Sequence, residues 1–213
     1  MSSASTNLTA QILRHALPLV KSHGFTRQAL ASAVLSLPGH SEPLSDTAVN
    51  SLFGSGDAAR TTLIKYWLEE GLEEMGGKKG SSINSILKHR LQWNEPVLPY
   101  LPEAFAVLST PIPGPPVDPR PAFWHAATIA DEAAYLSGEE NNGTDWYARR
   151  ASLGAIYLAA ELHQLSSPST AGGFLDSLLH DLKGVEDALS NTAQFSQFIG
   201  RSWIGIIRSL GLT

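Results

Sequence analysis

Apolar residues recur at intervals of three and four along nearly the whole chain, a spacing that places them on one face of an α-helix. No segment alternates apolar and polar residues in the way a half-buried strand does. The sequence therefore predicts an all-α fold. The predicted helices cover residues 12–20, 29–37, 46–53, 57–74, 81–94, 121–138, 145–165, 171–190 and 193–211.

Boundary residues support the first three of these helices. Gly24 follows the first helix, where a left-handed residue without a Cβ commonly ends it. Thr26 precedes the second helix, and its hydroxyl suits an N-cap. Ser45 or Asp46 has the same role before the third helix, which we expect to end at Phe53.

Proline marks the internal boundary of the chain. Nine of the thirteen prolines lie in residues 96–121, a concentration that breaks helices. We expect a helix-turn-helix-like subdomain with a first core helix in residues 1–75. A helical core for ligand binding and dimerisation follows in residues 76–190, interrupted by the proline-rich break, and residues 191–213 form a separate amphipathic helix.

Composition excludes several classes of protein. The net charge of −5 creates no overall field that favours nucleic acid. The absence of cysteine excludes disulfides, thiolate catalysis and sulfur-ligated metals. No run of 18 apolar residues predicts a membrane-spanning helix, and residues 1–11 do not have the pattern of a secretory signal.

The N-terminal third resembles the helix-turn-helix domain of TetR-type regulators. The resemblance is carried by TAQILRHALPLVKSHGFTRQALASAV and DTAVNSLFGSGDAARTTLIKYWL. In that family the third helix enters the DNA major groove. Here this helix, SDTAVNSLFG, contains an aspartate and no basic residue, although counterion release requires several cations at phosphates. We predict a degenerate helix-turn-helix that does not bind nucleic acid.

Enzyme signatures are missing from the sequence. A di-iron helical bundle needs two Glu-x-x-His motifs, and neither occurs; the pair Glu161 and His163 has the wrong spacing. The seven histidines show no HExxH arrangement. The segment GGKKGSS lacks the order of a phosphate-binding loop, and Ser55 is not preceded by a strand. We therefore predict no catalytic residue, no metal and no cofactor.

The start of the helix at 145–165 carries two bulky aromatics and two cations, Trp146, Tyr147, Arg149 and Arg150. Cations near a helix N-terminus oppose the macrodipole, so folding alone does not favour them there. Aromatic and arginine side chains are enriched where proteins dock. We predict a partner-binding patch in which the arginines pair with Asp131, Glu132 or acids of the partner. The alternative is that Trp146 and Tyr147 are core residues that staple the helix start.

The middle of the same helix, ASLGAIYLAA, has no charged residue and several small ones. Small residues allow helices to approach closely or leave space between them. Such space suits an apolar ligand. We predict that a lipid cavity is lined by Leu153, Ile156 and Tyr157.

The C-terminal segment predicts an amphipathic helix with a purely cationic polar face, since no acid follows Asp187. One interpretation is a terminal helix packed on the core. The other is an interfacial helix with its apolar face in lipid and its arginines near anionic headgroups. The residues predicted to contact membrane are Phe195, Phe198, Ile199, Arg201, Trp203, Ile206, Ile207, Arg208 and Leu210.

The block WYARRASLGAIYLAAEL, with the segments ILRHALPLVKSHG and LPEAFAVLSTP, resembles the Coq-nine-type family of ubiquinone biosynthesis accessory proteins. The resemblance covers nearly the whole chain. It implies a TetR-like fold and a non-enzymatic homodimer that binds an isoprenoid or quinone-type lipid, or a phospholipid. It also implies that quinone precursors are presented to the di-iron hydroxylase of the coenzyme Q biosynthetic complex.

The resemblance further implies roles for particular residues and a location. Trp146 and Tyr147 correspond to the patch that contacts the hydroxylase, and residues 193–211 to the helix that contacts the membrane. The implied location is mitochondrial, peripheral to the matrix side of the inner membrane.

Two other functions remain open at this point. A ligand-responsive TetR-type transcription regulator would need basic residues from elsewhere, such as Arg14, Lys21 and Arg27, to gather on one DNA-binding face. An enzyme with an unrecognised site would turn over quinone precursors by itself.

Overall fold

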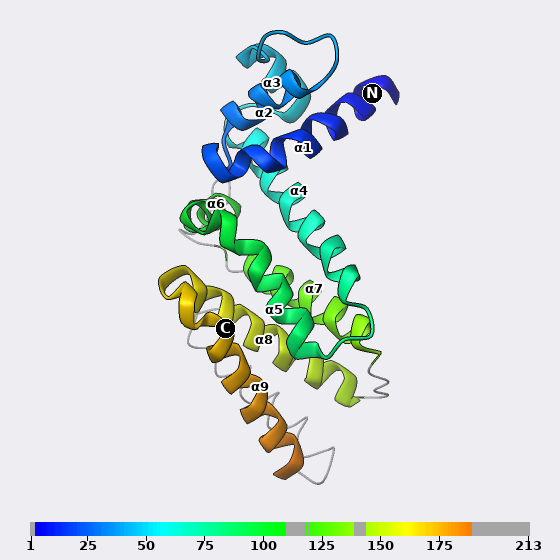
Figure 1. The fold of residues 1–213 in the computed structure, drawn as a ribbon, viewed down its shortest axis with the longest axis vertical. Coiled ribbons are helices and arrows are strands. Elements are labelled where there is room, and N and C mark those ends of the chain that lie inside the picture. Colours follow the sequence, from blue (N-terminus) through cyan, green and yellow to red (C-terminus); the bar gives the residue numbers. More distant parts are fainter. Residues whose placement is uncertain (1–2, 110–117, 119, 139–143, 189–213) are drawn as a thin grey trace. The chain divides into compact units, whose positions relative to one another are not determined.

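The structure, a computed structural model, describes residues 3–109, 118, 120–138 and 144–188 (Figure 1). Every regular element in these ranges is helical, so the predicted all-α class is confirmed. The contacts divide the chain into two compact units. The first contains residues 1–74 and 93–119, and the second contains residues 75–92 and the chain from residue 120 onward. The contacts thus place residues 93–119 with the N-terminal unit rather than with the rest of the 76–190 segment.

The first unit is built around helices α1 (Ser3–His23), α2 (Arg27–Ala33), α3 (Asp46–Phe53) and α4 (Asp57–Met75). A short 3-10 helix, Val34–Ser36, extends α2. The apolar positions that gave the helical spacing are those that the fold buries, including Ile12, Val20, Leu30 and Leu63. The ring of Phe25 meets Trp67 edge-on, with centroids 5.5 Å apart, and Trp67 packs on Trp93 at 6.0 Å.

The predicted boundary residues Gly24, Thr26 and Ser45 are confirmed, although α1 begins at Ser3 rather than near residue 12 and α2 ends at Ala33. The Thr26 hydroxyl accepts a hydrogen bond from the Ala29 N–H at 3.2 Å, and the Ser45 hydroxyl accepts one from the Ala48 N–H at 3.3 Å. Ser45 is therefore the cap of α3, and Asp46 is its first residue. Gly24 has φ +65°, and a Cβ there would lie 2.8 Å from Cδ1 of Tyr100. Both its conformation and its packing favour glycine.

The proline-rich break is more helical than the sequence predicts. A 3-10 helix spans Glu95–Tyr100, and α6 spans Leu101–Ser109. Pro96 occupies the first turn of the 3-10 helix and Pro102 the first turn of α6. An N–H has no helical partner in a first turn, so proline costs little there.

The second unit contains most of α5 (Ile83–Asn94) together with α7 (Arg120–Ser137), α8 (Thr144–Ser166) and α9 (Ala171–Ala188). Helix α8 packs against both α7 and α9 (Figure 1). A Cβ on Gly154 would lie 3.5 Å from the Ala126 carbonyl oxygen and 3.6 Å from the Ala127 Cα. The backbones of α7 and α8 therefore come close at this glycine, as the small residues of the segment predict.

Polar contacts fix α5 against its neighbours in this unit. The Gln164 amide donates to the Leu91 carbonyl at 2.8 Å. The Lys88 ammonium and the Asn84 amide both donate to the carboxylate of Asp176, at 2.7 and 2.6 Å. These hydrogen bonds hold the pKa of Asp176 below its usual value, the one from Lys88 having the largest effect.

The predicted helix at 193–211, with all nine residues predicted to contact membrane, lies outside the described residues. Among the helices that the structure describes, none has the length and apolar character needed to cross a membrane.

Candidate functional site

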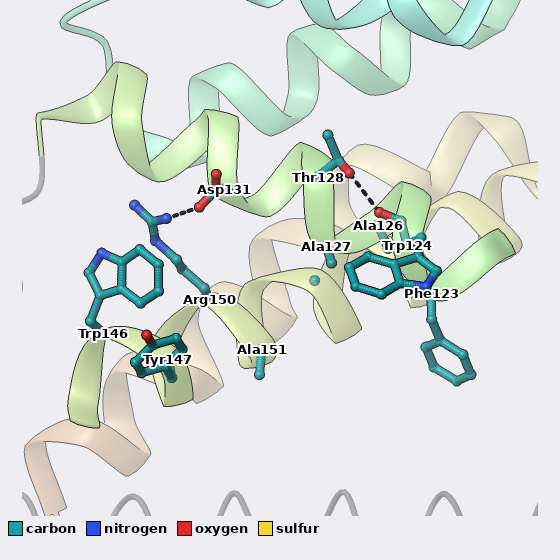
Figure 2. Close-up of a pocket in the computed structure, with 11 residues that line it drawn as sticks. Phe123, Trp124, Ala126, Ala127, Thr128, Asp131, Trp146, Tyr147, Arg150 and Ala151 are labelled. Carbon is teal, nitrogen blue, oxygen red and sulfur yellow. Dashed lines mark hydrogen bonds and ion pairs between the residues drawn. The ribbon is translucent and has the colours of Figure 1, made fainter. Parts of the chain in front are cut away.

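An apolar groove of about 720 Å³ lies between α7 and α8 (Figure 2). We call it the aromatic groove. Phe123 and Trp124 lie at one end, Trp146 and Tyr147 at the other, and alanines between them. Aromatic, small and polar residues of both helices line it: Phe123, Trp124, Ala126, Ala127, Thr128, Asp131, Trp146, Tyr147, Arg150, Ala151 and Gly154.

Three side chains near the start of α8 pack on one another at one end of the groove. The rings of Trp146 and Tyr147 meet edge-on, with centroids 4.5 Å apart. The Arg150 guanidinium carbon lies 3.7 Å from the centroid of the Trp146 ring. Residues 146 and 150 are one turn apart on the same helix face, so the cation covers the tryptophan.

The carboxylate of Asp131 on α7 completes this cluster, because it forms an ion pair with Arg150 (Figure 2). The sequence predicted such a pairing between the arginines and Asp131 or Glu132. Burial lowers the pKa of the Arg150 guanidinium. Contacts with the Trp146 ring and the Asp131 carboxylate thus offset the unfavourable position of this cation near the helix N-terminus. It also holds Trp146 in a fixed orientation.

The exposure of the aromatic side chains separates the two interpretations of the Trp146–Tyr147 pair. Tyr147 is 71% exposed and is therefore not a core residue. Trp146 is half-buried, with Arg150 over its ring. The pair does not staple the helix start into the core as the alternative requires. An exposed aromatic beside an apolar groove is typical of a surface that another molecule covers.

Sequence reasoning missed Trp124, which is 72% exposed at the other end of the groove. The signal available in the sequence was a pair of adjacent bulky aromatics, Phe123 and Trp124, near the start of a predicted helix, as at Trp146 and Tyr147.

Two residues of the predicted patch lie apart from the groove. Arg149 lines a second cavity, of about 360 Å³, between α5, α8 and α9. Glu132 is half-buried and does not line the aromatic groove. Neighbouring positions on a helix are rotated by about 100°, so Arg149 and Arg150 face different surroundings.

The three residues predicted to line a lipid cavity do not line the aromatic groove. Leu153 is buried and lines the second cavity, and Ile156 is half-buried. The Tyr157 hydroxyl donates to Glu161 Oε1 at 2.9 Å in the core, and Nε2 of His125 lies 3.3 Å from the same oxygen. From this part of α8 the groove uses the small residues Ala151 and Gly154 instead.

Two arginines of the helix-turn-helix region, Arg27 and Arg60, form ion pairs inside their own unit. Arg27 donates to the Asn50 side chain at 2.8 Å and lies 3.5 Å from the Asp46 carboxylate. Arg60 pairs with Asp57 at 3.1 Å and with Glu103. Each of these cations is therefore partly neutralised by an acid, which reduces what it can offer to DNA phosphates.

Among the residues that the structure describes, no three His, Asp or Glu side chains gather closely enough to hold a metal ion.

The residues that line the groove lie in a segment that matches a known protein family. The model of the family described as COQ9 matches residues 120–186. The resemblance noted in the sequence is confirmed. The COQ9 match covers α7, α8 and most of α9, and it contains every residue that lines the aromatic groove.

Proteins with COQ9 names align with much more of the chain. The ubiquinone biosynthesis protein coq9, mitochondrial, of Schizosaccharomyces pombe is 26% identical over 95% of this chain and 81% of its own length. A probable ubiquinone biosynthesis protein coq9 of Dictyostelium discoideum is 29% identical over 82% of this chain and 59% of its own. The COQ9 protein of Rattus norvegicus is 29% identical over 80% of this chain and 57% of its own length. The chain thus spans less than two thirds of the latter two proteins.

Proposed function

We propose that this chain is a non-enzymatic accessory protein of ubiquinone biosynthesis in the mitochondrion. In this proposal it binds an isoprenoid quinone precursor and presents it to the di-iron hydroxylase of the pathway. The names of its relatives support the pathway and the compartment. The aromatic groove supports the binding and the docking.

One observation carries the proposal: the two aromatic residues predicted to contact the partner are also walls of the apolar groove. Trp146 and Tyr147 mark the docking patch in the sequence, and both line a space of about 720 Å³. Ligand pockets commonly measure about 300–1,000 Å³ and are mostly apolar. A lipid in this groove would lie against the surface where the partner docks. The lipid could then be presented to the partner without moving from one side of the protein to the other.

The polar residues of the groove lie at one of its ends. Asp131 and Arg150 pair beside Trp146, whereas alanines form the middle (Figure 2). An isoprenoid chain would lie over the alanines, where desolvation costs nothing for either surface. The oxygens of a quinone-type head would face the ion pair, whose groups supply both a donor and an acceptor.

Membrane contact and dimerisation complete the proposal. The amphipathic segment 193–211 would hold the chain at the matrix face of the inner membrane, near anionic lipid. Helices α8 and α9 would form a homodimer interface, since α9 has more apolar surface than one packing face requires. The DNA-binding alternative receives no support from Arg27 and Arg60, whose partners lie within the first unit.

Two measurements test the proposal: the identity of the bound lipid and the effect of the chain on turnover by the hydroxylase. The full chain is purified without detergent, and its bound lipid is identified by native mass spectrometry and extraction. The hydroxylase is then assayed with its membrane-bound substrate, with and without the chain. We expect a co-purified isoprenoid lipid and faster turnover when the chain is present. Absence of lipid together with unchanged turnover would overturn the proposal, and turnover by the chain alone would show that it is an enzyme.

A further inference from the structure

The two ends of the aromatic groove differ in their chemistry. At one end, the ion pair of Arg150 and Asp131 lies beside Trp146 (Figure 2). At the other end lies Trp124, most of which is exposed to solvent. The groove is therefore amphipathic along its length, with charged groups at one end and an exposed indole ring at the other.

One face of α7 connects these two ends. Four residues that line the groove follow one another on this face at spacings of three and four: Trp124, Ala127, Thr128 and Asp131. The step from Trp124 to Asp131 covers roughly 10 Å along the helix axis, because each residue rises by about 1.5 Å. A ligand that contacts both ends of the groove must extend over this distance.

The lining near Trp124 favours hydrocarbon over polar groups. The hydroxyl of Thr128 donates to the backbone carbonyl oxygen of Trp124 at 2.8 Å, so this donor is used within α7. Alanines lie between Thr128 and the ion-paired end (Figure 2). A polar ligand group placed here would lose hydrogen bonds to water and find few replacements, which costs free energy. The tail of an amphiphile, rather than its head, therefore suits this end.

Tryptophan is well suited to cover a hydrocarbon chain at a protein surface. The indole ring has a large apolar face, whereas its N–H can stay in contact with water. A single exposed aromatic residue is common on proteins, but Trp124 borders an apolar groove of about 720 Å³. A chain in the groove would remove part of this ring from water, and that burial of apolar surface stabilises the complex.

We infer that Trp124 determines the chain length that the groove selects, because it covers the part of the ligand that extends roughly 10 Å beyond the ion pair. This inference rests on the proposed function, since it concerns the same lipid site. A ligand whose head lies at Arg150 and Asp131 reaches Trp124 only if its tail passes over the alanines. A prenyl group is too short to do so, whereas a farnesyl group is long enough. Trp124 thus binds the distal isoprene units and does not contact shorter chains.

Quinones that differ only in chain length test this role. The probes are a dimethoxy-methyl-benzoquinone without a side chain and the same quinone with a prenyl, geranyl or farnesyl chain. Isothermal titration calorimetry with the full chain measures the Kd of each probe. The unmodified protein should bind the farnesyl quinone at least about tenfold more tightly than the prenyl quinone, because the longer chain removes more apolar surface from water.

Substitutions of Trp124 then locate the preference. Trp124→Ala should weaken binding of the farnesyl quinone by about tenfold, and change binding of the prenyl and chainless quinones by less than about twofold. Trp124→Phe keeps an apolar ring and should retain most of the preference for the long chain. Tyr135→Ala is the matched control, because Tyr135 is also exposed on α7 but does not line the groove. This control should leave every Kd unchanged.

The outcomes distinguish this inference from the proposed function. Equal losses for all probes in Trp124→Ala, or no loss for the farnesyl quinone, would overturn the role of Trp124 while lipid binding stands. Weaker binding of the hydroxylase by Trp124→Ala, with quinone binding unchanged, would also overturn it and assign the residue to the partner surface. If no probe binds the unmodified protein, the lipid-binding part of the proposed function fails, and the role of Trp124 fails with it.

Discussion

The guanidinium carbon of Arg150 lies over Trp146, 3.7 Å from the centre of its ring, and the guanidinium pairs with Asp131 on the neighbouring helix. This stacking explains why a cation is found near the start of α8 despite the helix dipole. It fixes the orientation of a half-buried tryptophan at the mouth of an apolar groove. A preorganised aromatic side chain loses less conformational entropy when a ligand or partner covers it.

The stacking itself is testable by Arg150→Lys. Lysine keeps the charge but cannot lie flat on the ring or hold the carboxylate with a fork. We expect the free energy of unfolding to fall by about 0.5–1 kcal/mol, and the fluorescence maximum of the native protein to shift as Trp146 becomes more hydrated. Arg149→Lys is the control, since Arg149 is not in this cluster. Equal losses in the two variants would show that the stacking adds nothing.

Docking of the hydroxylase is tested by Tyr147→Ala. The side chain is 71% exposed, so its removal should leave the melting temperature within about 2 °C. Hydroxylase binding should weaken by about 2 kcal/mol, roughly thirtyfold in Kd, because exposed aromatics at interfaces are frequent hot spots. Surface plasmon resonance measures the change.

The matched control is Tyr135→Ala. Tyr135 is 66% exposed on α7 and does not line the groove, so its truncation should leave Kd unchanged. Trp146→Ala should weaken docking as Tyr147→Ala does. If Trp146→Ala instead unfolds many degrees early, Trp146 acts as a core residue and the docking interpretation fails.

Ligand uptake by the groove is tested by Ala127→Trp. Ala127 is exposed in the middle of the groove, so an indole there fills the space without displacing core atoms. Co-purified lipid, counted by native mass spectrometry, should fall by at least about fivefold, since the substituted ring occupies the apolar volume. Ala10→Trp, at an exposed alanine of α1 in the other unit, should retain the wild-type amount. Unchanged lipid in Ala127→Trp would place the ligand elsewhere.

The carboxylate of Asp176 predicts a pH dependence of stability. Its pKa is lowered in the folded state, chiefly by the hydrogen bond from Lys88. The stabilisation that the ionised carboxylate contributes is therefore complete above the pKa of the unfolded state, about 4. It disappears as the pH falls through the lower pKa of the folded state. Both side chains are more than a third exposed, so the contribution is less than about 1 kcal/mol. Urea unfolding should show wild type more stable than Asp176→Asn at pH 7 and equal to it near pH 2. A constant difference across this range would contradict the assignment.

Membrane contact is tested by deleting residues 193–213. The full chain should float with liposomes that contain cardiolipin, and binding should fall with ionic strength, because each arginine near anionic lipid contributes about 1 kcal/mol that salt screens. The truncated chain should remain folded and stay unbound. Trp203→Lys should lose nearly as much binding, since it places a charge within the apolar face. Flotation of the truncated chain at the wild-type level would mean that the segment does not bind lipid.

The sequence by itself determined the helical class, the capped ends of helices and the resemblance to the COQ9 family. Apolar spacing and capping side chains are local properties, and a helix satisfies its backbone within its own segment. For this reason Thr26 and Ser45 were correctly predicted as caps. The helix predicted at 145–165 differs by one residue at each end from α8, Thr144–Ser166. Prolines in first turns were the local exception, since the same residue breaks a helix interior and begins a helix well.

Tertiary structure alone decided which faces of these helices form sites. Arg149 and Arg150 are neighbours in the sequence, but Arg150 lines the aromatic groove between α7 and α8, whereas Arg149 lines the second cavity beside α9. Tyr157 was expected beside a ligand, yet its hydroxyl is needed by the buried Glu161. The orientation of a helix about its own axis depends on all its neighbours, and that information is distributed over the whole chain.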